Sequence, residues 1–131
     1  MSADDFFDTN VVVYLLSADR QKADIAERLL MGGGVVSVQV LNEFASVVTR
    51  KFGLGMADLR EALARIQAVC TAVPLDVETH ALGLDVAERY HLAIYDAMIV
   101  AAALRSGCRV LHTEDLNSGQ VGQLIIRNPF L

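Results

Sequence analysis

The sequence predicts an α/β fold with a central, mainly parallel sheet that helices cover on both faces. Short apolar runs alternate with helical stretches along the chain, which is the pattern of a parallel sheet. With 131 residues, of which 53% are hydrophobic and 21% are charged, the chain has the size and composition of one globular domain. No internal repeat, low-complexity segment or proline-rich linker divides it, so we expect residues 1–131 to form a single domain.

The first half of the chain predicts two strands and four helices. "FFD" (residues 6–8) is a short strand, and a helix is expected from about Asn10 to Ser17. The amphipathic stretch "DRQKADIAERLLMGGG" predicts a second helix that stops at glycines 32–34. "VVSV" (35–38) is the second strand, and "QVLNEFASVVTRKFG" predicts a helix with one apolar face. "GMADLREALARIQAVC" predicts another helix, whose apolar series continues to a buried Cys70.

The second half of the chain predicts three more strands and two helices. "TAVPLD" (71–76) is the third strand, and "VETHALGLDVAERYH" and "YDAMIVAAALRSG" are helices, the latter nearly all apolar. "RVLHT" (109–113) is the fourth strand, and "LIIRNPF" (124–130) is expected as a last strand at an edge of the sheet. In sheets of this type, ligands bind outside the carboxyl ends of the strands.

Charge and composition restrict the classes of function. The net charge of −5 argues against broad, nonspecific binding of nucleic acid, although it leaves room for a local basic rim. The longest stretch without charge, Leu29 to Asn42, has 14 residues and three glycines, so we expect no membrane span. The acidic start "MSADDFFD" is unlike a signal peptide, and Cys70 and Cys108 form no metal-spaced pair. A reduced, cytoplasmic setting fits these features.

Four acidic residues follow the apolar runs at positions that a parallel sheet brings to one edge. Asp8 ends the first strand, Glu43 lies early in the helix after the second, Asp96 opens the nearly all-apolar helix, and Asp115 follows the fourth strand. Four converging carboxylates cannot all stay ionised without a cation. Carboxylate oxygens suit Mg²⁺ or Mn²⁺, which favours metal-assisted attack of water on a phosphodiester.

Each acid also has a simpler structural explanation. Asp8 could cap the following helix, and Asp96 could complement the positive end of its own helix. Asp115 could be an ordinary turn residue in "EDLNSG", and a glutamate such as Glu43 is usually exposed to solvent. These explanations are weaker together, because all four acids fall at the same edge of the sheet.

Three other polar residues near this edge have two possible roles. Asn10 and Thr113 could orient the carboxylates by hydrogen bonds, or could be ordinary turn residues. Arg50 lies seven residues after Glu43 on nearly the same helical face, where it could meet a phosphate at the rim. A solvated surface arginine is the alternative at that position.

The stretches "FFDTNVVVYLLS", "SVQVLNEFASVV", "LAIYDAMIVAAAL" and "LHTEDLNSGQ" resemble the motifs of the PIN-domain family. The resemblance is greatest to VapC-type toxins of bacterial toxin–antitoxin pairs. It implies an α/β/α sandwich and an endoribonuclease that depends on Mg²⁺ or Mn²⁺. The family's acidic positions fall on Asp8, Glu43, Asp96 and Asp115, and its supporting polar positions on Asn10 and Thr113.

The resemblance also implies partners: an RNA substrate, a cognate antitoxin that covers the groove, and a second copy of the chain in a homodimer. Similar toxins often carry another acid just past the fourth motif, where this chain has Asn117, Ser118 and Gly119. The number of metals, one or two, stays open. So does the RNA target, which could be a tRNA, a ribosomal loop or mRNA.

Two other functions are compatible with parts of the pattern. A phosphatase or dehalogenase could use Asp8 as a nucleophile, but it would want a second aspartate where Asn10 stands. A non-catalytic PIN domain could bind RNA without cleaving it, but a binding module has no need of four intact acids. The pattern therefore favours a metal-dependent endoribonuclease.

Overall fold

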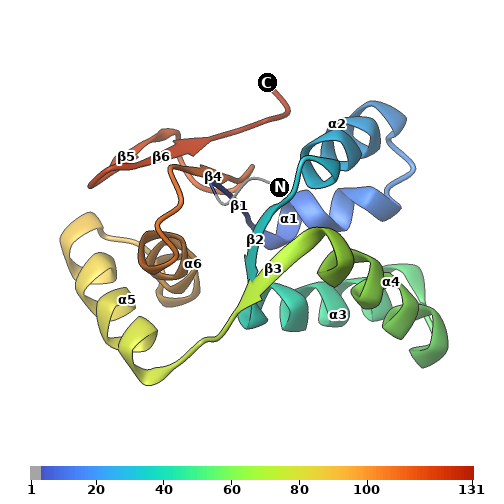
Figure 1. The fold of residues 1–131 in the computed structure, drawn as a ribbon, viewed down its shortest axis with the longest axis horizontal. Coiled ribbons are helices and arrows are strands. Elements are labelled where there is room, and N and C mark those ends of the chain that lie inside the picture. The colour runs from blue at the N-terminus through green and yellow to red at the C-terminus, as the bar shows by residue number, and fades with distance from the viewer. Residues whose placement is uncertain (1–3) are drawn as a thin grey trace.

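The computed structural model describes residues 4–131, and it contains one six-stranded sheet (Figure 1). The strands lie in the order β3-β2-β1-β4-β6-β5, and only the β5–β6 pair is antiparallel. Their bounds are β1 Asp5–Phe7, β2 Gly34–Ser37, β3 Cys70–Val73, β4 Val110–His112, β5 Gly119–Val121 and β6 Leu124–Arg127. The predicted mainly parallel sheet is therefore confirmed.

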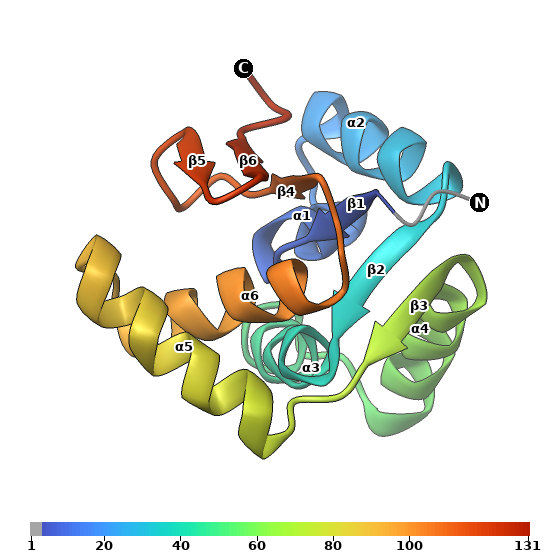
Figure 2. The same ribbon diagram turned by 60° about the vertical axis from the view of Figure 1, so that its left-hand side comes forward.

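Helices cover both faces of this sheet. Figures 1 and 2 show α5 and α6 on one side and α1, α2 and α4 on the other, while α3 continues directly from β2. The bounds are α1 Thr9–Val13, the 3₁₀ helix η1 Tyr14–Leu16, α2 Arg20–Met31, α3 Val38–Phe52, α4 Met56–Val69, α5 Val77–Tyr90 and α6 Ile94–Arg105. This is the expected α/β/α arrangement. Within residues 4–131, no helix has the length and apolar character needed to cross a bilayer.

Short polar side chains fix where several helices begin and end. Asp19, Ser37 and Asp76 each accept a hydrogen bond from the backbone N–H three residues further on. Such a cap contributes about 1 kcal/mol by satisfying a donor that the helix leaves unpaired. At the other end of α3, Gly53 adopts the left-handed conformation (φ 64°, ψ 26°), which stops the helix just after Phe52.

The core is one cluster of buried side chains that joins the sheet to α6 and to α1, α2, α3 and α4. Phe6, Phe7, Val36 and Leu111 of the central strands are fully buried, and so is most of the run 97–103 of α6. That helix is nearly all apolar because the sheet covers one side of it and α5 the other. A Cβ at Gly83 of α5 would overlap the Met98 thioether, so glycine permits this close approach.

Three predicted elements differ from the structure. The strand expected at 71–76 is Cys70–Val73, so Cys70 is buried as predicted but belongs to β3 and not to a helix. The helix expected to reach Ser17 is α-helical only to Val13 and continues as a 3₁₀ turn. The strand expected at the edge, β6, is interior, because the short β5 pairs outside it. Sequence reasoning missed β5, whose three residues include a glycine and carry little periodic signal.

Candidate metal and active site

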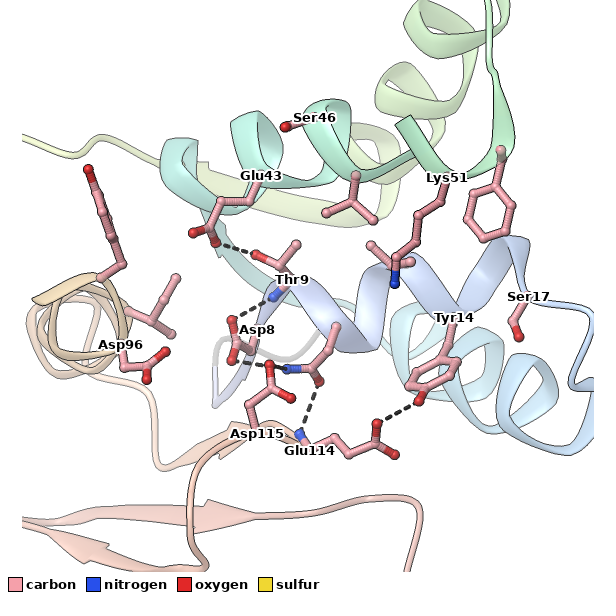
Figure 3. A pocket seen from close by; sticks show the side chains of 16 residues that line it. Asp8, Thr9, Tyr14, Ser17, Glu43, Ser46, Lys51, Asp96, Glu114 and Asp115 are labelled. Carbon is pink, nitrogen blue, oxygen red and sulfur yellow. Dashed lines mark hydrogen bonds between the residues drawn. The ribbon is translucent and has the colours of Figure 1, made fainter. Parts of the chain in front are cut away.

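The carboxyl ends of the central strands open into a pocket of about 570 Å³ (Figure 3). Its walls come from the end of β1, from α1, from one side of α3, from the start of α6 and from the loop after β4. All four acids predicted from the sequence line it: Asp8, Glu43, Asp96 and Asp115. The structure thus brings together four carboxylates from four separate segments of the chain.

Asp8 is the most buried of these acids, with 5% of its surface exposed. Its Oδ1 accepts a hydrogen bond from the Thr9 backbone N–H at 2.7 Å, so Asp8 does cap α1. Its Oδ2 accepts hydrogen bonds from the Thr113 hydroxyl at 2.8 Å and the Asn10 amide at 3.2 Å. Burial, aided by the charges of Asp115 and Glu43, raises the pKa of Asp8 to about 6 despite these hydrogen bonds. Capping alone therefore does not account for its surroundings.

Asn10 and Thr113 connect Asp8 to the loop that carries Asp115. The Asn10 amide also donates to Asp115 Oδ2 at 3.1 Å, and its carbonyl oxygen accepts from the Glu114 backbone N–H at 3.0 Å. The Thr113 hydroxyl accepts from the Asp115 backbone N–H at 3.1 Å. These two residues hold the carboxylates of Asp8 and Asp115 on the same side of the pocket.

Glu43 is held by two residues that sequence reasoning missed. Thr9 donates its hydroxyl hydrogen to Glu43 Oε1 at 2.6 Å, and Gln39 Nε2 lies 3.4 Å from Glu43 Oε2. Gln39 is buried, and the same amide donates to the Tyr95 backbone carbonyl at 3.0 Å. Gln39 therefore links α3 to the start of α6. Its spacing of four residues from Glu43 on one helical face is a signal that could have identified it.

Asp96 stands in the first turn of α6 and points toward Asp8 and Asp115 (Figure 3). Its half-buried carboxylate has no hydrogen bond or ion pair to another part of residues 4–131. Burial, followed by the charges of Asp115 and Glu43, raises the pKa of Asp96 above its ordinary value. The repulsion among these acids is what a shared cation would relieve.

A fifth acid, Glu114, lines the pocket but is already paired with a cation. Lys22 Nζ donates to Glu114 Oε2 at 2.6 Å, and the Tyr14 hydroxyl donates to Glu114 Oε1 at 2.5 Å. Although partial burial raises the pKa of Glu114, these two hydrogen bonds hold it below the usual value. Lys22 and Tyr14 lie 92 and 100 residues away in the sequence, so no local pattern indicates the cluster.

The family model described as the PIN domain matches residues 6–123. The chain belongs to the PIN domain family. No curated protein matches the sequence, but several solved structures share its fold.

Three of these structures show the range of proteins with this PIN fold. A toxin–antitoxin complex from Klebsiella pneumoniae superposes with a TM-score of 0.70 and 21% identity, over 95% of this chain and 96% of that one. VapBC2 of Rickettsia felis, bound to a promoter DNA fragment, superposes with a TM-score of 0.68 and 18% identity, over 95% of this chain and 97% of that one. VapC20 of Mycobacterium tuberculosis, a toxin that cleaves the sarcin–ricin loop, superposes with a TM-score of 0.66 and 18% identity, over 85% of this chain and 89% of that one. At these identities the likeness establishes the fold alone.

The donors in the pocket of this PIN domain suit a hard divalent cation. They are carboxylate and amide oxygens, without a histidine or cysteine among the lining residues. Within residues 4–131, however, no three such side chains lie close enough together to hold an ion as they stand. The set therefore fits Mg²⁺ or Mn²⁺ in its chemistry, and side-chain rotations would have to bring the oxygens together.

The basic residue on the wall of the pocket is Lys51, not Arg50. Arg50 is exposed in the last turn of α3 and is not among the residues that line the pocket. The pocket follows the slanted row Glu43, Val47 and Lys51, in which each residue is four positions after the last. Seven residues are nearly two full turns of a helix, so Arg50 lies almost directly along the helix axis from Glu43, and it is not among the residues that line the pocket.

Two neighbouring acids should respond differently to removal of their charge. Asp115→Asn is expected to weaken binding of Mn²⁺ by about 10-fold or more, because removal of a residue that only hydrogen-bonds to a metal ligand already has an effect of that size. Glu114→Gln should change it by less than about 3-fold, because Lys22 already neutralises that carboxylate. Isothermal titration of both variants at one pH measures the difference. Equal losses would instead make Glu114 a metal ligand.

Proposed function

We propose that this PIN domain is an endoribonuclease that depends on Mg²⁺ or Mn²⁺ and acts as the toxin of a toxin–antitoxin pair. The observation that carries the proposal is the convergence of Asp8, Glu43, Asp96 and Asp115 in one pocket at the carboxyl ends of the strands. The burial of Asp8 and its three hydrogen bonds support a fixed functional position, since burying a carboxylate is otherwise costly.

All four acids have a place in the proposed mechanism. Asp8, Glu43, Asp96 and Asp115 would hold the cation, and hydrogen bonds already orient Asp8, Glu43 and Asp115. A bound Mg²⁺ or Mn²⁺ would act as a Lewis acid on the phosphate and lower the pKa of water. One of these carboxylates would also help to remove a proton from the attacking water, and Asp96, which carries no hydrogen bond to another part of residues 4–131, is the one whose oxygens no protein group occupies.

A cognate antitoxin, an RNA substrate and a second copy of the chain are the partners that we propose. The structures with this fold include a toxin–antitoxin complex from Klebsiella pneumoniae and VapBC2 of Rickettsia felis, which support an antitoxin. VapC20 of Mycobacterium tuberculosis, which cleaves the sarcin–ricin loop, supports a structured RNA as substrate. A cytoplasmic setting agrees with Cys70 and Cys108, whose thiols are buried and have pKa values raised to about 11 by burial.

The geometry disfavours the two other functions. An enzyme that uses Asp8 as its nucleophile would want a second aspartate two residues further on, where this chain has Asn10. Asn10 uses its amide to orient two carboxylates and cannot serve as an acid or base. A PIN domain that only binds RNA would have no use for four repelling acids in its binding pocket.

Cleavage of RNA in the presence and absence of metal tests the proposal. The purified protein should cut a structured RNA at few positions with Mg²⁺ or Mn²⁺, and EDTA should stop the reaction completely. Gel mapping of the cut sites measures both properties. Cleavage that resists EDTA would indicate a different chemistry. Uniform degradation of unrelated single strands at physiological salt would contradict the expected selectivity of an acidic protein.

A further inference from the structure

Two exposed aromatic rings line the pocket, one from the start of α6 and one from the end of α3. Tyr95, which is 71% exposed, directly precedes Asp96 on α6. Phe52, which is 45% exposed, directly follows Lys51 at the end of α3. Both residues line the same pocket as the four acids. Aromatic faces that water can reach beside a site for phosphate chemistry are suited to stacking on nucleic-acid bases.

Lys51 is the one basic side chain among the described residues that line this pocket. Figure 3 shows it pointing into the pocket from α3, on the side away from Asp96. The other lysine of the chain, Lys22, is paired with Glu114, whereas Lys51 has no ion pair or hydrogen bond to another side chain within residues 4–131. Its charge is therefore available to a ligand.

The position of Lys51 separates its role from that of the acids. Glu43 and Lys51 are eight residues apart on α3, which corresponds to about 12 Å along the helix axis. Lys51 forms no ion pair with any of the carboxylates of the pocket within residues 4–131. It can meet a second phosphate of a strand whose scissile phosphate lies at the acids.

We infer that the pocket holds an unpaired RNA strand across the acids, with one base stacked on Tyr95, another on Phe52 and a flanking phosphate on Lys51. The inference rests on the proposed nuclease function and names three residues that bind its substrate. Bases in a duplex are stacked on each other, and the major groove of duplex RNA hides their edges, so the two rings would have no partner there. A loop or a bulge presents the free base faces that the two rings need.

Lys51 alone supplies little affinity for phosphate, so the stacked bases should provide most of the binding. Stacking tolerates different bases because each has an aromatic face. The shape of the unpaired segment, more than its sequence, should then decide which RNA enters.

Binding to the Asp96→Asn variant in Mn²⁺ tests the inference without cleavage, because a cation then separates the remaining acids from the phosphate. Fluorescence anisotropy would compare a labelled, unstructured single-stranded RNA with the same sequence annealed to its complement. The Asp96→Asn protein, which serves as the reference for the further variants, should prefer the single strand. Tyr95→Ala and Phe52→Ala should each weaken that binding by about 5- to 150-fold, the range expected for loss of one stacked base. Tyr95→Phe and Phe52→Tyr keep an aromatic face and should bind as the reference protein does.

Lys51→Gln and Arg50→Gln form a matched pair at adjacent positions of the same helix turn. Lys51→Gln should weaken binding and reduce the slope of log affinity against log salt by about 0.7, the value for one phosphate contact on a single strand. Arg50→Gln should change neither, since Arg50 does not line the pocket. Because Tyr95 and Phe52 are exposed, thermal melting should be unchanged in their variants, which separates lost binding from lost folding.

The outcomes distinguish failure of this inference from failure of the nuclease proposal. If RNA is cleaved with Mg²⁺ but the alanine variants bind as the reference protein does, the stacking positions are wrong and the nuclease stands. If the variants lose binding but the wild type never cleaves RNA, the subsite stands and the nuclease proposal fails. Equal binding of duplex and single strand would overturn the inference. Loss of binding to a protein partner alone would assign the two rings to that partner.

Discussion

Asp8→Asn should reduce RNA cleavage by more than about 100-fold. Removal of a residue that only hydrogen-bonds to a metal ligand already lowers metal affinity or activity by about 10- to 100-fold, so removal of a ligand itself should lower the activity further. Asp8 is buried, and its oxygens are fixed by Thr9, Asn10 and Thr113, so no mobile neighbour can replace it. Single-turnover cleavage of a structured RNA in Mg²⁺ or Mn²⁺ measures the effect.

Two comparisons make the Asp8 prediction specific. Asp96→Asn and Glu43→Gln should also abolish cleavage, because each removes a charge and keeps the size of the side chain. Thr113→Val removes the hydroxyl that donates to Asp8 and accepts from the Asp115 backbone N–H but leaves all four acids, so it should reduce cleavage by about 10- to 100-fold and leave some activity. Full activity of Asp8→Asn with either metal would show that the four acids are not the site.

The convergence of the acids was predictable because it depends on topology alone. In a parallel sheet, residues that follow the strands meet at one edge whatever the details of packing are. The residues that hold the acids were less accessible to sequence reasoning. Gln39 lies on the same helical face as Glu43, but Lys22 and Tyr14 reach Glu114 from positions about 100 residues away. Only the folded chain brings such residues together.

The choice between Arg50 and Lys51 shows the limit of reasoning from helical periodicity. A seven-residue spacing from Glu43 indicates Arg50 as a candidate at the rim, whereas the basic side chain that lines the pocket itself is Lys51, the next residue of α3. The relative placement of two helices decides which row faces the pocket, and the sequence of one helix does not contain it. The same limit applies to β6, which is interior only because the three-residue β5 pairs with it.

The stability of the protein in EDTA should rise as the pH is lowered from about 7 to about 5. Asp8 has a pKa of about 6 in the fold against 3.8 as an ordinary aspartate, so the native state binds its proton more tightly than the unfolded chain does. Ionising Asp8 therefore costs stability as the pH rises, by about 1.3 kcal/mol between pH 5 and pH 7, out of about 3 kcal/mol over the whole range from below pH 3.8 to above pH 6. Glu114, with a lowered pKa, works in the opposite direction, but only as the pH falls below the usual carboxylate range.

Asp96→Asn should raise the melting temperature in EDTA by about 2–5 °C, although it removes an acid from the first turn of a helix. Asn keeps the size of the side chain, and no hydrogen bond to another part of residues 4–131 is lost. It removes a partly buried charge that Asp115 and Glu43 repel, which is the reason that the pKa of Asp96 is raised. The gain in melting temperature from excess Mn²⁺ should shrink in the variant, because mass action stabilises a native state in proportion to its affinity for the ion.

Asp58 provides a matched control for the effect of the helix end. It stands in the first turn of α4, as Asp96 does in α6, and the residues before both helices provide no side-chain cap. Asp58 is exposed and lies outside the pocket, so Asp58→Asn should remove only the favourable interaction with the helix end, worth about 0.3–1 kcal/mol. In EDTA, the melting temperature should therefore fall for Asp58→Asn and rise for Asp96→Asn. If Asp96→Asn also melts lower and keeps the full gain from Mn²⁺, Asp96 only stabilises α6, and the site consists of the other three acids.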